Sequence, residues 1–110
     1  MNINDSQFIN NITMEGVSNG GGAIVNEGNL IVYNSNFTSN KVAYGGGAIY
    51  IDQTAINVTI INSNFNNNSV TITGGAIFTI DSLFRANMVI NGSNFTNNKA
   101  LSSDGAITNG

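Results

Sequence analysis

The chain has 110 residues and a net charge of −3 at pH 7, and 41% of its residues are hydrophobic but only 8% are charged. This length suits one small domain, and the absence of a basic cluster argues against nucleic acid and anionic membranes as partners. The chain contains neither His nor Cys, which removes the commonest general base, the best transition-metal ligands and any disulfide. No apolar stretch approaches about 18 residues, and residues 1–5 lack the features of a signal peptide, so we expect neither a transmembrane helix nor an export signal here.

Two short motifs alternate along the chain at a nearly constant period. The first is Gly-Gly-Ala-Ile, with a degenerate last copy, at residues 21–24, 46–49, 74–77 and 104–107. The second centres on a Phe that recurs with spacings of 29, 28 and 30 residues, at Phe8, Phe37, Phe65 and Phe95. A period near 28 predicts a supersecondary unit that buries its apolar face only by stacking on its neighbours.

Each repeat begins with a predicted strand that precedes the Phe. When the copies are aligned on the Phe, one set of alternate positions is apolar throughout: Met1, Ile3, Leu30, Val32, Val58, Ile60, Met88 and Ile90. The positions between them are mixed in character: Asn2, Asn4, Ile31, Tyr33, Thr59, Ile61, Val89 and Asn91. Because side chains alternate across a strand, we expect the first set to point inward and the second outward.

A polar turn follows the Phe and ends in an Asn in every copy, at Asn11, Asn40, Asn68 and Asn98. Asn tolerates the left-handed conformation, so we expect it to form a sharp corner. After a short apolar segment, the glycines of the first motif, Gly22, Gly47 and Gly75, form a second corner where a side chain would obstruct the bend. Ala-Ile then starts another strand, and the pattern does not indicate which of the two residues faces inward.

The third corner varies in length. From the Ala of one motif to the next Phe the distance is 14, then 17, then 19 residues, and a stacked solenoid tolerates insertions at one corner. The sequence therefore predicts an all-β, right-handed parallel β-helix of about four coils with three strands each, the handedness following the general rule for parallel crossovers. We expect one domain, residues 1–110, with coils near 1–24, 25–49, 50–77 and 78–110, as a fragment of a longer solenoid.

Stacking places equivalent residues in columns along the solenoid. We expect an aromatic stack of Phe37, Phe65 and Phe95 in the core. We also expect two ladders of hydrogen-bonded side-chain amides, one of Asn36, Asn64 and Asn94 and the other of Asn40, Asn68 and Asn98. These columns are interpreted as structural.

Two further columns are candidate sites. Glu27, Asp52 and Asp81 follow the Ile of the first motif by three or four residues and form an acidic corner, which is a weak Ca²⁺ candidate or simply a solvated corner. Apart from this weak Ca²⁺ candidate, the sequence indicates no metal site and no cofactor. The outward-facing apolar residues form a candidate binding stripe, consisting of Ile31, Tyr33, Ile61 and Val89. Alternatively, the long corner around residues 83–84 covers this stripe.

The pairing of Gly-Gly-Ala-Ile with Phe-x-x-Asn resembles the repeat of the chlamydial polymorphic outer membrane proteins and of adhesin-like surface proteins of methanogenic archaea. The motif pairs are residues 21–24 with 37–40, 46–49 with 65–68, and 74–77 with 95–98. The resemblance implies a right-handed β-helix displayed at the cell surface, in the outer membrane or secreted. It also implies a role in adhesion. The implied partners are a host or neighbouring cell-surface protein or glycan, and the neighbouring coils of the same longer chain.

We therefore expect a non-catalytic, adhesin-like surface module, acting as a stalk or as an adhesion surface. A carbohydrate-active β-helix enzyme fragment is an alternative, but it needs clustered carboxylates with a base. The chain has only four Asp, two Glu, two Lys and one Arg, so we expect no enzyme. A second alternative is a self-assembling Asn-rich segment, since 22 residues are Asn and the ends of the solenoid are open edges.

Overall fold

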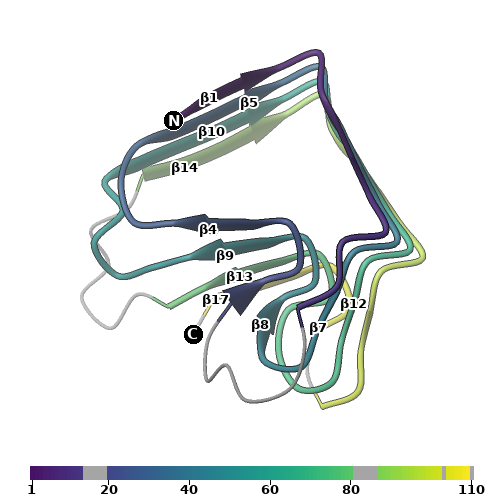
Figure 1. Cartoon of the computed structure of the whole chain (residues 1–110). Coiled ribbons are helices and arrows are strands. Elements are labelled where there is room, and N and C mark those ends of the chain that lie inside the picture. Colours follow the sequence, from purple (N-terminus) through teal and green to yellow (C-terminus); the bar gives the residue numbers. More distant parts are fainter. Residues whose placement is uncertain (14–19, 81–86, 103, 110) are drawn as a thin grey trace.

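The computed structural model describes residues 1–13, 20–80, 87–102 and 104–109, and all its regular elements are β-strands. Every strand pair is parallel, and the chain winds into a β-solenoid whose successive turns lie side by side (Figure 1). Pairing of each strand with the strand one repeat later explains the parallel arrangement, because a repeating chain returns to the same direction after each turn. The predicted all-β, parallel β-solenoid is confirmed, whereas its right-handedness and its number of coils stay predictions.

The strands form five sheets, which we call A to E in chain order. Sheet A has the order β1 (Asn2–Asn4), β5 (Leu30–Tyr33), β10 (Asn57–Ile61) and β14 (Asn87–Asn91). Sheet B has the order β2 (Gln7–Ile9), β6 (Asn36–Thr38), β11 (Asn64–Asn66) and β15 (Asn94–Thr96). Sheet C joins β7 (Lys41–Val42), β12 (Ser69–Val70) and β16 (Lys99–Ala100), and sheet D joins β3 (Gly20–Gly21) and β8 (Gly45–Gly46). Sheet E has the order β4 (Ile24–Asn26), β9 (Ile49–Ile51), β13 (Ile77–Thr79) and β17 (Ile107–Asn109).

The repeat is divided more finely than the three strands predicted. The strand before the Phe forms sheet A, the Phe itself lies in a separate strand of sheet B, and Ala-Ile leads into sheet E. The short strands of sheets C and D lie at the glycine corner between sheets B and E (Figure 1). The register that the Phe alignment predicts is confirmed, because Phe65 pairs with Phe37 on one side and Phe95 on the other.

The core lies between sheets A, B and E. The inward set of sheet A is buried as predicted in the inner strands, where Leu30, Val32, Val58 and Ile60 are fully buried. Met1 is the exception, since 60% of its surface is exposed. It precedes the edge strand β1, whose outer side faces no other strand of sheet A, so the predicted inward position offers it little to pack against.

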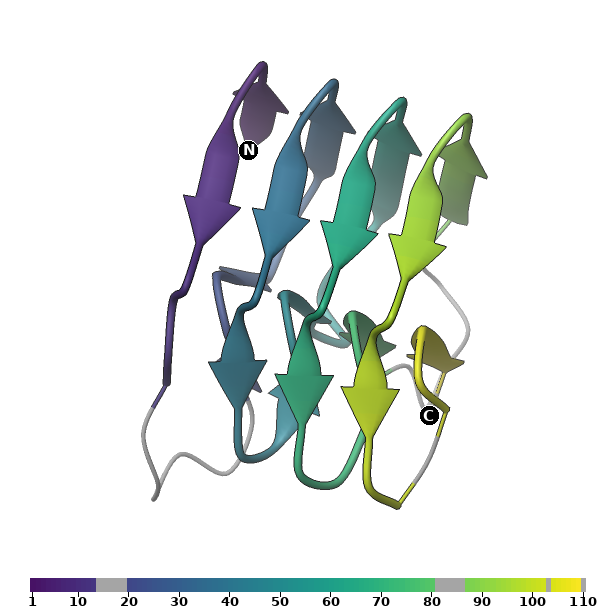
Figure 2. The same ribbon diagram turned by 90° about the vertical axis from the view of Figure 1, so that its right-hand side faces the viewer.

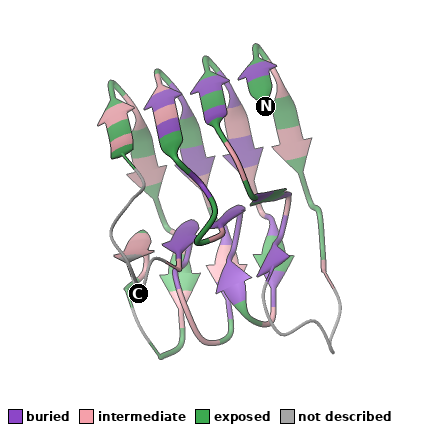
Figure 3. Ribbon diagram, turned by 90° about the vertical axis from the view of Figure 1, so that its left-hand side faces the viewer, coloured by how far each residue is buried: buried purple, intermediate pink, exposed green. Residues whose placement is uncertain are grey.

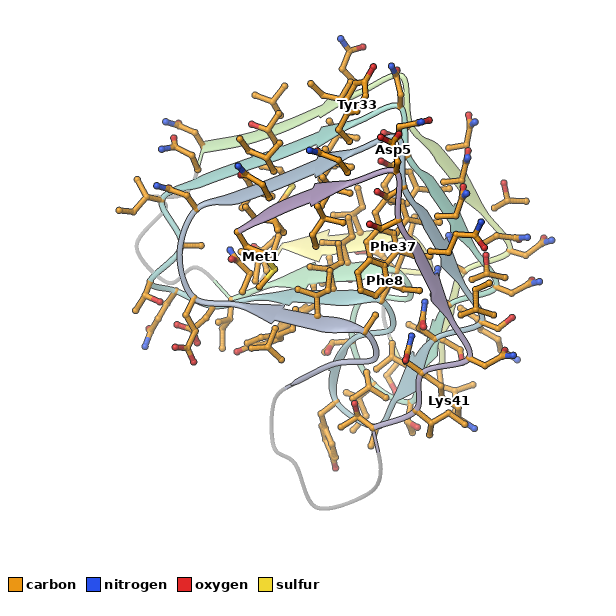
Figure 4. All side chains as sticks on the ribbon, turned by 45° about the horizontal axis from the view of Figure 1, so that its top comes forward. Met1, Asp5, Phe8, Tyr33, Phe37 and Lys41 are labelled. Atoms are coloured by element: carbon orange, nitrogen blue, oxygen red, sulfur yellow. The ribbon has the colours of Figure 1, made fainter. Side chains whose placement is uncertain are left out.

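The Phe residues stack at the centre of this core. Their rings are nearly parallel, with centroids 4.7 to 4.8 Å apart between neighbours. Figure 4 shows Phe8 directly beside Phe37, both inside the ribbon. The spacing matches the separation of parallel strands, so the backbone register itself sets the aromatic stack.

The structure resolves the question of which residue of Ala-Ile faces inward. Both Ala48 and Ile49 are fully buried in the core. Ala48 lies at the corner just before β9 begins at Ile49, and the N–H groups of both residues donate to the carbonyl oxygen of Ala76. The bend at the corner, rather than strand alternation, turns two consecutive side chains to the same side.

The predicted left-handed corner is displaced by one residue. Positive φ occurs at the residue before each predicted Asn, namely at Asn10, Ser39, Asn67 and Asn97, with φ between 54° and 56°. The prediction that Asn11, Asn40, Asn68 and Asn98 adopt this conformation was therefore wrong. The left-handed residue turns the chain so that the side chain of the following Asn enters a buried column, where its amide is used for hydrogen bonding instead.

The glycine corner is as tight as the sequence suggests. A Cβ atom on Gly47 would lie 2.1 Å from the carbonyl oxygen of Gly75 and 2.7 Å from the backbone nitrogen of Ser69. Gly22 and Gly75 meet comparable backbone atoms of their neighbours. The backbones of adjacent coils thus approach closely at this corner, and only glycine leaves room for them.

Candidate functional site

The outer face of sheet A carries the candidate binding stripe, consisting of Ile31, Tyr33, Ile61 and Val89. Strand pairing aligns it in two adjacent columns: Ile31 pairs with Thr59, which pairs with Val89, and Tyr33 pairs with Ile61. The exposed fractions of Ile31, Tyr33 and Val89 are 43%, 45% and 54%. Ile61 is only partly exposed. Figure 3 shows the alternation of exposed and buried positions along these strands, and Figure 4 shows Tyr33 on the outside of the solenoid.

Polar columns border this stripe on both sides. At the start of the strands, the backbone N–H of Asn57 donates to Oδ1 of Asn29 at 3.1 Å, and Nδ2 of Asn87 lies 3.5 Å from Oδ1 of Asn57. At the other end, Nδ2 of Asn34 donates to Oδ1 of Asp5 at 2.6 Å. An apolar strip with a polar, nearly uncharged border therefore covers the outer face of sheet A. Sequence reasoning missed the Asn29 column, although the recurrence of Asn before each strand was visible.

The structure does not decide whether another segment covers the stripe. Residues 83–84, which the alternative interpretation invoked, lie outside the described residues. The binding role of the stripe stays a prediction.

The outer face of sheet B is polar (Figure 2 looks onto this side). Its amides form the exposed ladder that the sequence predicts: Nδ2 of Asn64 donates to Oδ1 of Asn36 at 2.8 Å, and Nδ2 of Asn94 donates to Oδ1 of Asn64 at 3.0 Å. A shallow depression of about 380 Å³ lies on β11 and β15. It is wide open, and two of its lining amides, Asn64 and Asn94, already bond each other, so it is a weaker candidate site than the apolar stripe.

The buried amide ladder holds neighbouring coils together. Oδ1 of Asn68 accepts hydrogen bonds from the backbone nitrogen and from Nδ2 of Asn40, at 3.0 and 2.9 Å. Nδ2 of Asn68 donates to the carbonyl oxygen of Phe37 and to Oδ1 of Asn98. Asn40 and Asn68 are fully buried, and these bonds satisfy polar groups that would otherwise be costly to bury. The geometry agrees with the structural interpretation of this column.

A serine ladder runs parallel to the asparagine ladder. The backbone N–H of Ser35 donates to Oγ of Ser63 at 3.1 Å, and Oγ of Ser63 donates in turn to the carbonyl oxygen of Ile61 at 2.9 Å. Ser precedes Asn-Phe in three copies, at residues 35, 63 and 93, and sequence reasoning assigned it no role. Its constant position two residues before the Phe was the available signal.

The acidic corner is only partly described. The N–H of Asp52 donates to the carbonyl oxygen of Asn26, which places Asp52 beside Glu27 in the neighbouring coil. Oδ1 of Asp52 already accepts hydrogen bonds from the backbone nitrogen and the hydroxyl of Thr54. Asp81 lies outside the described residues. Within the described residues no three side chains among His, Cys, Asp and Glu are grouped as metal ligands would be, and the Ca²⁺ site stays an untested prediction.

Among the described residues, the one titratable group with a shifted pKa lies on sheet E. Burial raises the pKa of the Tyr50 hydroxyl above its usual value of 10.0, and the nearby carboxylate of Asp52 raises it further. Tyr50 is only 3% exposed and packs beside Phe78 with ring centroids 5.8 Å apart. A hydroxyl kept neutral in a packed position suits a structural role.

A family model supplies the decisive comparison. The model of the Chlamydia polymorphic membrane protein repeat matches residues 5–27, 34–52 and 62–80, which together make up more than half of the chain. The chain belongs to this family. Each match contains one copy of Gly-Gly-Ala-Ile and runs from the corner before the Phe to the residue after the strand of sheet E, so that it covers one coil without its sheet A strand.

Membership in the polymorphic membrane protein family suggests a repeat module of a surface or outer-membrane protein, from a family of non-enzymatic surface proteins. A search of curated proteins and a search of solved structures each found no match. In the part of the chain that the structure describes, no helix has the length and hydropathy needed to cross a membrane.

Proposed function

We propose that this chain is a non-catalytic adhesion module of a cell-surface protein, and that it contacts a protein on another cell through the outer face of sheet A. The observation that carries the proposal is the in-register apolar stripe on that face. Three of its four side chains are 43% to 54% exposed. Family membership supports a surface location, where such a face meets other cells.

The chemistry of the stripe favours a protein partner over a glycan. Three of its four residues are branched aliphatic side chains, which gain stability by excluding water from another apolar surface. Tyr33 adds one amphipathic ring of the type enriched at protein interfaces. The polar columns on either side resemble the polar rim that surrounds the apolar centre of an interface.

A cell-binding experiment tests the proposal. Beads that carry the wild-type chain are expected to adhere to cultured host cells, and the double variant Tyr33→Ser, Ile61→Ser is expected to lose at least about tenfold in adhesion, because each truncation removes apolar contact area. The matched control is Tyr44→Ser, Ile56→Ser, since Tyr44 and Ile56 are 46% and 59% exposed and lie outside the stripe. This control is expected to adhere like the wild type.

Treatment of the target cells identifies the class of partner. Protease treatment of the cells should abolish adhesion, whereas enzymatic removal of glycans should leave it unchanged. If deglycosylation alone abolished adhesion, the partner would be a glycan and not a protein. Equal adhesion of the stripe variant and the wild type would exclude the outer face of sheet A as the contact surface.

A further inference from the structure

The triplet Asn-x-Ser/Thr, which is the acceptor motif of N-linked glycosylation, recurs along the chain. It begins at seven residues: Asn4, Asn11, Asn36, Asn57, Asn67, Asn91 and Asn94. In N-linked glycosylation a sugar becomes bonded to the side-chain nitrogen of the Asn, and the motif also requires the hydroxyl two residues later. An acceptor in the folded chain therefore needs an exposed amide and a hydroxyl that no other group holds.

Four of the seven amides are bonded to neighbouring coils. Nδ2 of Asn11, of Asn57 and of Asn94 each donates to the Oδ1 of an Asn in an adjacent coil, at 2.9, 3.3 and 3.0 Å. Asn36 is only partly exposed, and its Oδ1 accepts a hydrogen bond from Nδ2 of Asn64 at 2.8 Å. A sugar on these amides would crowd or displace contacts between coils.

Two of the remaining motifs have an exposed Asn but a hydroxyl that is already used. In the motif of Asn4, Oγ of Ser6 donates to the carbonyl oxygen of Asn4 at 2.7 Å. In the motif of Asn91, Oγ of Ser93 donates to the carbonyl oxygen of Asn91 at 3.2 Å and accepts a hydrogen bond from the backbone nitrogen of Ser63. Both hydroxyls thus belong to the local hydrogen bonding of their corners.

Among the described residues, only the motif at Asn67 keeps both groups free. Asn67 is exposed and has a φ of 55° at the corner between β11 and β12. Its side chain lies outside the solenoid, whereas that of the next residue, Asn68, is fully buried in the amide ladder. Within the described part of the chain, neither the amide of Asn67 nor the hydroxyl of Ser69 has a hydrogen-bond partner.

The next coil repeats this corner without the motif. Ser69 pairs with Lys99 on one side and with Lys41 on the other, and a Lys at this position removes the required hydroxyl. Asn97 occupies the same corner position as Asn67, is exposed and has a φ of 54°. The two corners therefore differ in the acceptor motif rather than in backbone conformation.

We propose that Asn67 is the N-glycosylation site of this chain, with a lipid-linked oligosaccharide as the sugar donor. Nδ2 of Asn67 forms a bond to the anomeric carbon of the first sugar and loses one proton. The bond between that carbon and the lipid pyrophosphate breaks, and the lipid pyrophosphate leaves. The proposal rests on the surface location in the proposed function, because export brings the chain to an oligosaccharyltransferase. The corner lies at the end of sheet B away from sheet A (Figure 1), so a glycan leaves the apolar stripe accessible.

Glycosylation of the folded chain in vitro tests the proposal. The unmodified full chain is incubated with a lipid-linked oligosaccharide and a purified oligosaccharyltransferase that requires only the triplet, and peptide mapping by mass spectrometry locates the sugar. We expect one glycan, at Asn67, and none in Asn67→Gln. Lys99→Ser completes the motif at Asn97 and should add a second glycan. Its matched control is Lys41→Ser, which places a hydroxyl in the same column but follows Ser39 and should add none.

Peptides separate the effect of folding from that of sequence. Synthetic peptides of residues 34–40 and 65–71 carry the motifs of Asn36 and Asn67 without the solenoid. Asn36 should be modified at least about tenfold more slowly in the folded chain than in its peptide, because the exposed ladder has to open first. Asn67 should react at similar rates in the folded chain and in its peptide.

Three outcomes of this experiment would overturn the proposal: a folded chain that gains no glycan, a glycan at another Asn in place of Asn67, or a Lys99→Ser variant that gains no second one. Far-UV circular dichroism verifies that each variant folds, and Ser69→Ala replaces Asn67→Gln if that variant does not. In the chain isolated from its source cells, peptide mapping should find the sugar on Asn67, and a bare Asn67 would equally refute the proposal. The bead assay of adhesion uses the unmodified chain, so the failure of one proposal does not decide the other.

Discussion

At the scale of single residues, Asn68 shows how one side chain fastens three coils. It accepts two hydrogen bonds from Asn40 in the preceding coil and donates to Asn98 in the following one. Its remaining amide hydrogen bonds the carbonyl oxygen of Phe37. An amide supplies both a double acceptor and two donors, which explains why Asn, rather than Asp or Ser, occupies this buried column.

Replacing Asn68 with Ala is expected to lower the free energy of unfolding by about 2 to 5 kcal/mol, because it leaves the buried N–H of Asn40 and the carbonyl oxygen of Phe37 without partners. Asn64→Ala is the control, since Asn64 belongs to the exposed ladder and should change stability by only about 0.5 kcal/mol. Urea denaturation measures both. Similar losses in the two variants would contradict the distinction between the ladders.

Gly47 gives a second prediction at the residue scale. Gly47→Ala places a Cβ atom 2.1 Å from the carbonyl oxygen of Gly75, so the coils must separate at this corner and we expect the cooperative unfolding transition to disappear. Gly28→Ala meets no atom within 4 Å and should be neutral or stabilise the chain by up to about 1 kcal/mol. Thermal melts followed by circular dichroism compare the two. A native-like melt of Gly47→Ala would show that the corner can relax.

At the scale of elements, sheet E differs from sheets A and B because both faces of its inner strands, β9 and β13, are buried. Ile49 and Ile51 face the main core, while Tyr50 between them is also buried. The glycine strands β3 and β8 contact β9 and lie on the side away from sheet A (Figure 1). The glycine corner thus folds back over the outer surface of sheet E and gives the solenoid a second packed layer.

Burial of Tyr50 predicts a loss of stability at high pH. Its pKa is raised in the folded chain, so the unfolded chain releases the proton first, and stability falls as the pH rises above the unfolded value of about 10. Tyr50→Phe should reduce this loss and keep the fold, because Phe78 occupies the same column in the next coil. Urea denaturation between pH 8 and pH 11 measures the effect. The same pH dependence in Tyr50→Phe and the wild type would assign it to other groups.

At the scale of the whole molecule, stability is distributed along one axis. Each coil contacts its neighbours through parallel strands, one aromatic stack and two buried polar ladders, so the inner coils are covered on both sides and the end coils on one. Repeat proteins of this kind gain much of their stability from contacts between neighbouring repeats. The end coils are therefore the least stable part of the described structure.

Substitutions in the aromatic column can measure this difference in stability between inner and end coils. Phe65→Ala should cost about 3 to 5 kcal/mol, because Phe65 is fully buried between two other rings. Phe95→Ala should cost clearly less, because Phe95 is only partly buried and stacks on one ring. Denaturant titration of both variants gives the comparison. Equal losses would mean that the end coil is as well covered as the inner ones.

The main features of the fold were predictable because they depend on the repeat itself. The spacing of Phe37, Phe65 and Phe95 fixes the strand register, and the alternation around Val32 and Ile60 fixes the inward face of sheet A. The left-handed corner was predicted at Asn40, but the structure has it one residue earlier, at Ser39. Composition shows which residues tolerate such a conformation but not which one adopts it. The residues of the apolar stripe were predictable, and the recurrence of Asn at the Asn29 position was visible in the sequence, whereas the bond between Asn34 and Asp5 emerged only from the stacking.

The repeat period was enough to predict a parallel β-solenoid with aligned Phe and Asn columns, because a motif repeated at a constant period has to stack on its own copies. The folded structure was needed to show that Ala48 and Ile49 both face inward and that Tyr50 is buried, because these depend on how the glycine corner folds over sheet E. It also revealed the direction of the polar ladders. Donor and acceptor become distinct only when two coils lie side by side.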